Sequence, residues 1–130
     1  MDRPILVDSN VFIYLLRAGR DPAIALGNRY AMVDLATCPM VRLEVLRGQR
    51  SPRVIERVEE FFDVLMNVPA DPRLWREATD LARDLERAGF TIPSQDALIA
   101  ASALRIGAAV FTFDRHFEQI PGIPLIREAL

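Results

Sequence analysis

Residues 4–16, PILVDSNVFIYLL, contain the change of pattern that decides the fold class. Residues 5–7 form a short apolar run with β-branched side chains, as in a buried strand, and the run stops at the polar residues 8–10. Apolar residues then recur at helical spacing up to position 16. The segment therefore predicts a strand, a turn and a helix, with Asp8 directly after the strand.

Short apolar strands and longer helices alternate along the rest of the chain. Most predicted helices open at a proline, and the helix that begins at Asp96 is apolar nearly all round, so we expect it to be buried. The alternation favours an α/β sandwich around a mainly parallel central sheet, in a single domain over residues 1–130. The predicted strands are 31–37, 109–113 and 124–126, with an extended piece at 67–69, and the predicted helices begin at Pro39, Pro52, Pro72 and Asp96.

The composition excludes several kinds of chemistry. The chain has 130 residues, 51% of them hydrophobic, which is enough for one continuous core, and its formal net charge of -2 argues against a basic stripe that binds nucleic acid. All 16 basic residues are arginine, which removes any mechanism that needs a lysine, such as a P-loop or a Schiff base. Arginine still suits phosphate, because its planar fork of donors matches phosphate oxygens.

Cysteine content and hydropathy bear on the cellular compartment. Cys38 is the only cysteine, so neither an intrachain disulfide nor a cysteine-built zinc site can form, and we expect an inert core thiol in a cytoplasmic protein. The longest apolar stretch, 97–113, is interrupted by Ser102, Arg105 and Gly107. It is too short and too polar for a membrane span, so we expect no membrane partner.

Four acidic residues occupy positions where their carboxylates can meet. Asp8 and Asp114 each follow a predicted strand, and ligands of an open parallel sheet bind at the carboxyl ends of its strands. Asp96 starts a helix, where the helix dipole favours a carboxylate, and Glu44 lies among apolar neighbours in another helix. Each acid alone can be a turn, cap or solvated residue. Together they predict an oxygen-rich cluster that prefers a hard cation, Mg²⁺ or Mn²⁺.

Four segments carry these acids, namely ILVDSNVFIYL at 5–15, VRLEVLRG at 41–48, DALIAA at 96–101 and VFTFDRHF at 110–117. With these segments in this order, the sequence resembles the PIN-domain ribonucleases, and most closely the VapC-type toxins of bacterial toxin-antitoxin pairs. Any one segment is a weak signal, but the four together span nearly the whole chain at the family's spacing. The resemblance implies a PIN-like α/β/α sandwich and a metal-dependent endoribonuclease that hydrolyses RNA.

The resemblance also assigns roles to individual residues. It implies that the residues that bind Mg²⁺ or Mn²⁺ are Asp8, Glu44, Asp96 and Asp114. The fourth of these positions varies within the family. In such a site two cations about 4 Å apart activate water and stabilise the leaving oxygen of the phosphodiester.

Small polar residues and one histidine flank the acids. Ser9, Asn10 and Thr112 fall where the family has supporting polar residues, although capping or turn hydrogen bonds explain them equally well. His116 is the only histidine, and we expect it near the rim of the site without a direct role. A ribonuclease mechanism that uses the RNA 2′-hydroxyl commonly needs more than one histidine, so attack by water fits this chain better.

The VapC resemblance further implies partners. It predicts a homodimer and a small antitoxin that inserts a basic side chain, most simply arginine, into the acidic cluster. Val54, Val58, Phe61 and Phe62 recur on one predicted helix, and we expect them in the core, with a surface groove for a helical antitoxin segment as the alternative. Trp75 also lies on an apolar stripe, and we expect it to pack in the core rather than to stack on a base.

Three other functions match parts of the pattern. A phosphoacceptor module would also place Asp8 after the first strand, but it normally needs a lysine, and the phosphatase pattern has an aspartate where this chain has Asn10. A housekeeping RNA-processing nuclease would share the site, and a neighbouring gene for a short DNA-binding protein would favour the toxin instead. A non-catalytic PIN-like binding module is disfavoured by the presence of all four acids.

Overall fold

Five parallel strands form one central sheet in the computed structural model, which describes residues 3–130. Their order is β3-β2-β1-β4-β5, so the first strand of the chain lies in the middle. The chain moves outward from β1 to β3 on one side and then crosses back to place β4 beside β1. The strands are β1 (Ile5–Val7), β2 (Leu35–Thr37), β3 (Met66–Asn67), β4 (Ala109–Phe111) and β5 (Leu125–Ile126).

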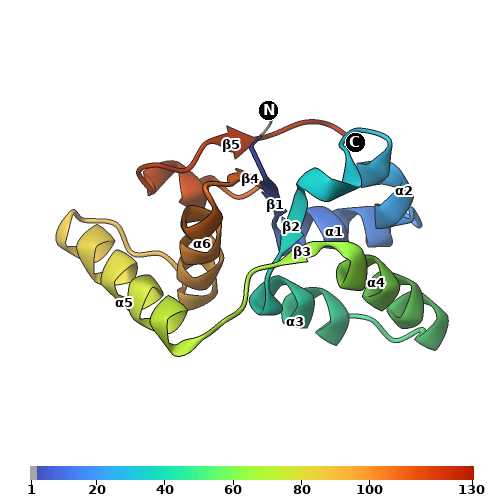
Figure 1. Cartoon of the computed structure of the whole chain (residues 1–130), viewed down its shortest axis with the longest axis horizontal. Helices are drawn as coiled ribbons and strands as arrows, with labels where there is room; N and C mark the ends of the chain where they lie inside the picture. The colour runs from blue at the N-terminus through green and yellow to red at the C-terminus, as the bar shows by residue number, and fades with distance from the viewer. Residues whose placement is uncertain (1–2) are drawn as a thin grey trace.

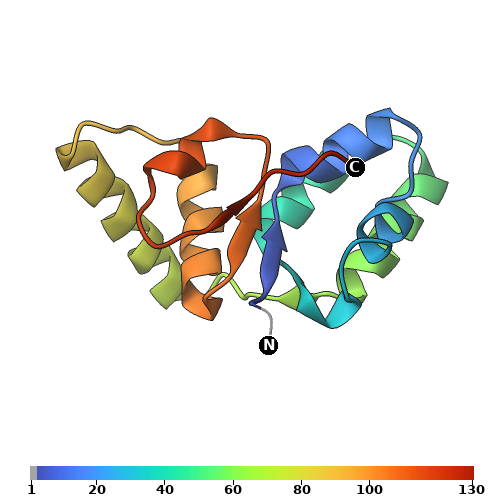
Figure 2. The same cartoon turned by 90° about the horizontal axis from the view of Figure 1, so that it is seen from above.

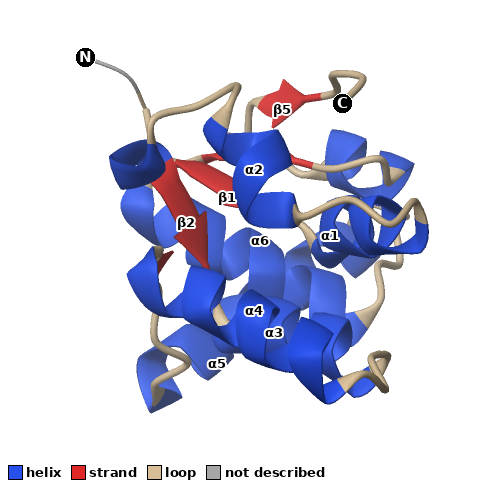
Figure 3. Cartoon of the chain, turned by 90° about the vertical axis from the view of Figure 1, so that its right-hand side faces the viewer, coloured by secondary structure: helices blue, strands red, loops and turns tan. Residues whose placement is uncertain are grey.

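Helices cover both faces of the sheet and make three layers (Figure 1, Figure 2). Helices α1 to α4 lie on one face, which Figure 3 views from outside, while α6 lies against the other face with α5 packed outside it. The predicted α/β/α sandwich with a parallel sheet is therefore confirmed. None of the helices within residues 3–130 combines the length and apolar character needed to cross a membrane. The helices are α1 (Ser9–Arg17), α2 (Pro22–Gly27), α3 (Pro39–Arg47), α4 (Pro52–Val64), α5 (Pro72–Arg87) and α6 (Ser94–Ile106), with short 3₁₀ helices η1 (Met32–Asp34) and η2 (Arg115–Gln119).

Capping residues explain where most helices begin and end. Proline lies in the first turn of α2, α3, α4 and α5, where its missing N–H costs no hydrogen bond. Asp21, Ser51 and Asp71 cap α2, α4 and α5 by accepting hydrogen bonds from backbone N–H groups. Helix α6 ends at Gly107, whose φ of 64° is a left-handed conformation that glycine adopts without strain.

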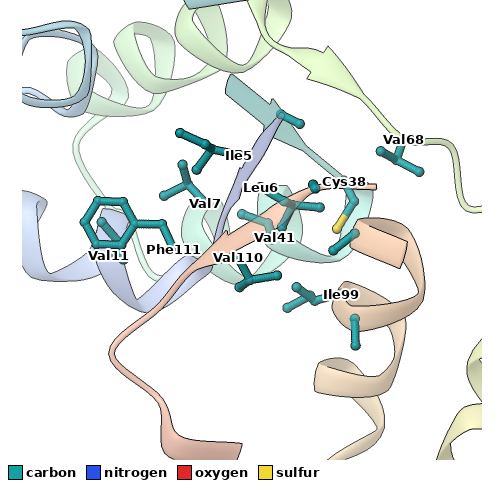
Figure 4. Packing of buried hydrophobic residues seen from close by; sticks show 14 of the residues in the cluster. Ile5, Leu6, Val7, Val11, Cys38, Val41, Val68, Ile99, Val110 and Phe111 are labelled. Carbon is teal, nitrogen blue, oxygen red and sulfur yellow. The ribbon is translucent and has the colours of Figure 1, made fainter. Parts of the chain in front are cut away.

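The hydrophobic core lies between the sheet and both helical layers. Figure 4 shows Val110 of β4 near Ile99 of α6 and the next residue, Phe111, near Val11 of α1, and all four side chains are fully buried. Cys38 lies in the same cluster as a buried free thiol, as predicted. The centre of the sheet is therefore held from both sides, which fixes the ends of β1 and β4 relative to each other.

The apolar face of α4 points into this core. Val58, Phe61 and Phe62 are buried, and Phe62 stacks against Phe12 of α1 with ring centroids 5.0 Å apart. The core interpretation of these three residues is confirmed, and only Val58 among them also lines a groove at the surface. Val54 is half-buried and lines a shallow groove that also includes residues of α1 and α2.

The prediction for Trp75 is wrong, because its side chain is 52% exposed. Helix α5 packs on α6 at the outside of the molecule and so needs only a narrow apolar stripe, which Leu74, Ala78 and Leu85 supply. Trp75 lies beside that stripe and lines a shallow surface pocket with Leu43 of α3. The side-chain spacing was correct for a helix, but it did not show that this helix packs mainly against α6.

Two predicted strands are shorter in the structure by two residues or more. The strand predicted over 31–37 begins only at Leu35, since η1 precedes it and Val33 is 81% exposed rather than packed. The strand predicted over 109–113 ends at Phe111, because the chain turns where the Thr112 hydroxyl accepts a hydrogen bond from the N–H of residue 114.

Two of the acids occupy slightly different positions in their elements from those predicted. Asp114 does not follow a strand directly, but caps η2 by accepting a hydrogen bond from the N–H of His116 at 2.9 Å. Asp96 lies in the first turn of α6 rather than at its start, because the helix begins at Ser94. The sequence patterns also did not predict α2.

Candidate metal centre

The order in which the chain adds strands to the sheet reverses between β1 and β4. The predicted acids lie around the carboxyl ends of these two strands. The two strands are neighbours, yet the chain leaves β1 toward β2 and returns through β4. Their pairing extends past the last strand residues, since the N–H of Asp8 donates to the carbonyl of Phe111 at 2.9 Å. Such a switch point at the carboxyl ends of parallel strands is where open α/β sheets bind ligands.

Asp8 is the most deeply buried acid of the group, with 3% of its surface exposed. One carboxylate oxygen accepts from the backbone N–H of Ser9 at 2.7 Å, so Asp8 caps α1, and the other accepts from the hydroxyl of Thr112 at 2.8 Å. Burial outweighs these hydrogen bonds and raises the pKa of Asp8 to about 6, and the charges of Asp96 and Glu44 add to the effect. Asp8 is thus held in a position that disfavours its own negative charge.

Thr112 connects the loop after β4 to Asp8 and α1. Its hydroxyl donates to Asp8 and accepts from the side-chain amide of Asn10 at 3.3 Å and from the N–H of Asp114 at 2.9 Å. The amide oxygen of Asn10 in turn accepts from the N–H of Phe113 at 3.3 Å. All hydrogen-bonding capacity of this buried hydroxyl is therefore used to fix the two acids relative to each other.

Glu44 reaches the same edge of the sheet from α3. Val41 and Val45, one helical turn apart, are fully buried and hold this part of α3 against the core. The Ser9 hydroxyl donates to the Glu44 carboxylate at 3.0 Å and so joins it to the start of α1. Partial burial raises the pKa of Glu44, and the charge of Asp96 raises it further.

Asp96, Asp114 and His116 form the remaining part of the cluster. The Nδ1 atom of His116 lies 2.8 Å from Asp96 Oδ2 and 3.1 Å from Asp114 Oδ1, and one ligand atom from each of the three lies within 4.8 Å of the others. Burial raises the pKa of Asp96, and the hydrogen bond to Asp96 raises the pKa of His116. His116 thus lies at the exposed rim of the cluster, as predicted, and it also contacts two of the acids.

The donors of the cluster match a hard divalent cation. Carboxylate oxygens predominate, and burial, with a smaller contribution from the charges of neighbouring acids, raises the pKa values of Asp8, Glu44 and Asp96. Mg²⁺ and Mn²⁺ prefer such oxygen donors, so these residues fit the group. The contact of His116 had one signal in the sequence, its position two residues after Asp114 in a tight loop.

Comparisons with known proteins decide the family. The sequence model of the PIN domain matches residues 5–123. The chain belongs to the PIN domain family. The predicted resemblance is therefore confirmed, and the acids described above lie within the matched part of the PIN domain.

Relatives and solved structures that are similar to this chain carry the names VapC and VapBC. Ribonuclease VapC11 of Mycobacterium tuberculosis is 28% identical, with 96% of this chain and 97% of the relative covered. A DNA-bound VapBC from Salmonella typhimurium has a TM-score of 0.77 at 23% identity, with 96% and 98% covered. VapC20 of Mycobacterium tuberculosis, a toxin that cleaves the sarcin-ricin loop, has a TM-score of 0.67 at 19% identity, with 88% and 92% covered. At these identities the solved structures support the fold alone.

Proposed function

We propose that this PIN domain is the toxin of a toxin-antitoxin pair and acts as a metal-dependent endoribonuclease. The observation that carries the proposal is the acidic cluster at the switch point of the sheet: Asp96 and Asp114 lie at metal-ligand spacing with His116, and the charges of Glu44 and Asp96 act on the buried Asp8. The relatives named VapC ribonuclease support RNA as the substrate. Single-stranded or looped RNA is expected, because its backbone and bases are accessible.

The proposed mechanism assigns a part to each side chain. Asp8, Glu44, Asp96 and Asp114 would hold Mg²⁺ or Mn²⁺, which when bound neutralises charge on the phosphate and promotes attack by water. The hydroxyls of Ser9 and Thr112 fix the carboxylates of Glu44 and Asp8 through the hydrogen bonds described above. Water attacks phosphorus and the O3′ atom leaves, so the products carry a 5′-phosphate and a 3′-hydroxyl.

A cleavage assay with the purified full chain tests this proposal. A labelled single-stranded RNA is incubated with Mg²⁺, with Mn²⁺ and with chelator, and the product ends are identified. Asp96→Asn should lower the cleavage rate by about 100-fold or more. The matched control is Asp80→Asn, because Asp80 is exposed on α5, the helix packed outside α6. Cleavage that persists in chelator, an active and folded Asp96→Asn variant, or cyclic-phosphate ends would each refute the mechanism.

We further propose a homodimer, located in the cytoplasm, that is silenced by a separate antitoxin. The acidic cluster attracts a guanidinium as well as a metal cation, and bidentate pairing would make that contact strong and directional. Co-expression with the protein encoded by the neighbouring gene should give a complex that cleaves RNA more slowly than the free chain. A complex with the full cleavage rate would contradict inhibition at the site, and a strictly monomeric free chain would contradict the dimer.

A further inference from the structure

We propose that His116 is a nitrogen ligand in the cation site and makes this site prefer Mn²⁺ over Mg²⁺. The inference rests on the proposed metal-dependent function and adds a ligand beyond the four acids. His116 is the only histidine of the chain, so the role can be traced to a single imidazole.

The ligand atoms already have the spacing of neighbouring positions around one cation. An octahedral ion with ligands at 2.0–2.1 Å separates adjacent ligand atoms by about 3 Å. Nδ1 of His116 lies 2.8 Å from Asp96 Oδ2 and 3.1 Å from Asp114 Oδ1. In the metal-free chain the 2.8 Å contact is a hydrogen bond, so an ion that binds the imidazole and both carboxylates takes the place of the proton shared by His116 and Asp96.

The backbone holds the imidazole in this place. The N–H of His116 donates to Asp114 Oδ1 at 2.9 Å, and the N–H of Asp114 donates to the Thr112 hydroxyl at 2.9 Å. Through that hydroxyl, the loop that carries His116 is tied to Asp8. The side chain of His116 is 48% exposed and that of Asp96 11%, so the ring lies on the solvent side of the cluster. The imidazole is thus positioned before any ion binds.

The chemistry of this donor gives the preference between cations. Carboxylate oxygens bind both cations, whereas an imidazole nitrogen is a poor ligand for hard Mg²⁺ and a better one for Mn²⁺, which is a transition-metal ion. Loss of the imidazole should therefore weaken Mn²⁺ binding by about tenfold or more. Mg²⁺ binding should change much less, because Mg²⁺ relies on the acids in both proteins.

Pulsed electron paramagnetic resonance of the full chain loaded with Mn²⁺ tests the ligand directly. Directly bound imidazole gives a ¹⁴N coupling, which must change when only histidine is labelled with ¹⁵N and vanish in His116→Asn. Calorimetric titrations then compare the dissociation constants of Mn²⁺ and Mg²⁺ for both proteins. Arg115→Gln is the matched control, because Arg115 is an exposed neighbour in the same loop.

The outcomes separate this inference from the proposed function. A histidine nitrogen coupling together with a selective loss of Mn²⁺ affinity in His116→Asn supports the ligand. Bound Mn²⁺ without that coupling, or equal losses for both cations, overturns the role of His116 and leaves the carboxylate site standing. Failure of the wild-type chain to bind either cation overturns the proposed metal-dependent function as well.

Discussion

Asp8→Asn should stabilise the metal-free protein, although it removes a residue that we place in the active site. Burial raises the pKa of Asp8 to about 6, compared with an ordinary value of 3.8, so the folded chain disfavours the negative charge. Asparagine removes that charge and keeps the size of the side chain. It also keeps the acceptor for the Ser9 N–H, which caps α1.

The size of the effect follows from the two pKa values and one hydrogen bond. The difference between about 6 and 3.8 corresponds to about 3 kcal/mol at pH 8. In the variant, the side-chain NH₂ group of asparagine replaces the carboxylate oxygen that accepts from the Thr112 hydroxyl. The loss of that hydrogen bond costs about 1 kcal/mol. The net gain is about 2 kcal/mol, or a rise of about 8 °C in Tm for a chain of this length.

The pH dependence has a definite sign. Because the pKa of this acid is raised in the folded state, its ionisation destabilises the fold fully above about pH 6 and not at all well below 3.8. The advantage of Asp8→Asn should therefore be present at pH 8 and disappear below about pH 4. Thermal unfolding in chelator at both pH values measures it, with Asp80→Asn within about 0.5 kcal/mol of wild type. A variant that is no more stable than wild type at pH 8, or equally favoured at pH 4, would refute the reasoning.

Three further predictions concern stability. Mg²⁺ at about 100 times its dissociation constant should stabilise the wild-type chain by about 2.7 kcal/mol and raise its Tm in a thermal unfolding experiment. A Tm that changes with neither Mg²⁺ nor chelator would contradict a metal site. Thr37→Val should add about 1 kcal/mol in a denaturant titration, because the buried Thr37 hydroxyl oxygen has no hydrogen-bond partner among residues 3–130, and a loss of stability would show that the hydroxyl is satisfied. Gly107→Ala should cost about 1 kcal/mol in the same titration, because its φ of 64° is unfavourable for a residue with a Cβ. An added Cβ would meet no atom within 4 Å, so the cost would come from the backbone alone, and an unchanged midpoint would contradict it.

Local patterns predicted the elements that depend on neighbours in sequence. The apolar run at 5–7 and the all-apolar helix after Asp96 gave a buried strand and a buried helix, because burial on all sides leaves few polar positions. The prolines and the glycine at 107 marked helix ends through their own backbone preferences. These features predicted the parallel α/β sandwich. The positions of the acids after strands and within helices predicted a site at the carboxyl ends of the strands.

Contacts between distant segments were decided only by the tertiary structure. Trp75 has the helical spacing of a core residue, but its exposure depends on α5 having α6 as its neighbour. The strand toward Asp114 ends early because the Thr112 hydroxyl, tied to Asp8 across the sheet, accepts the next N–H of the loop. His116 meets Asp96 for the same reason, since that turn brings the imidazole to the first turn of α6. Periodicity reports which side of an element is apolar, whereas these distances depend on how two elements far apart in the chain are packed together.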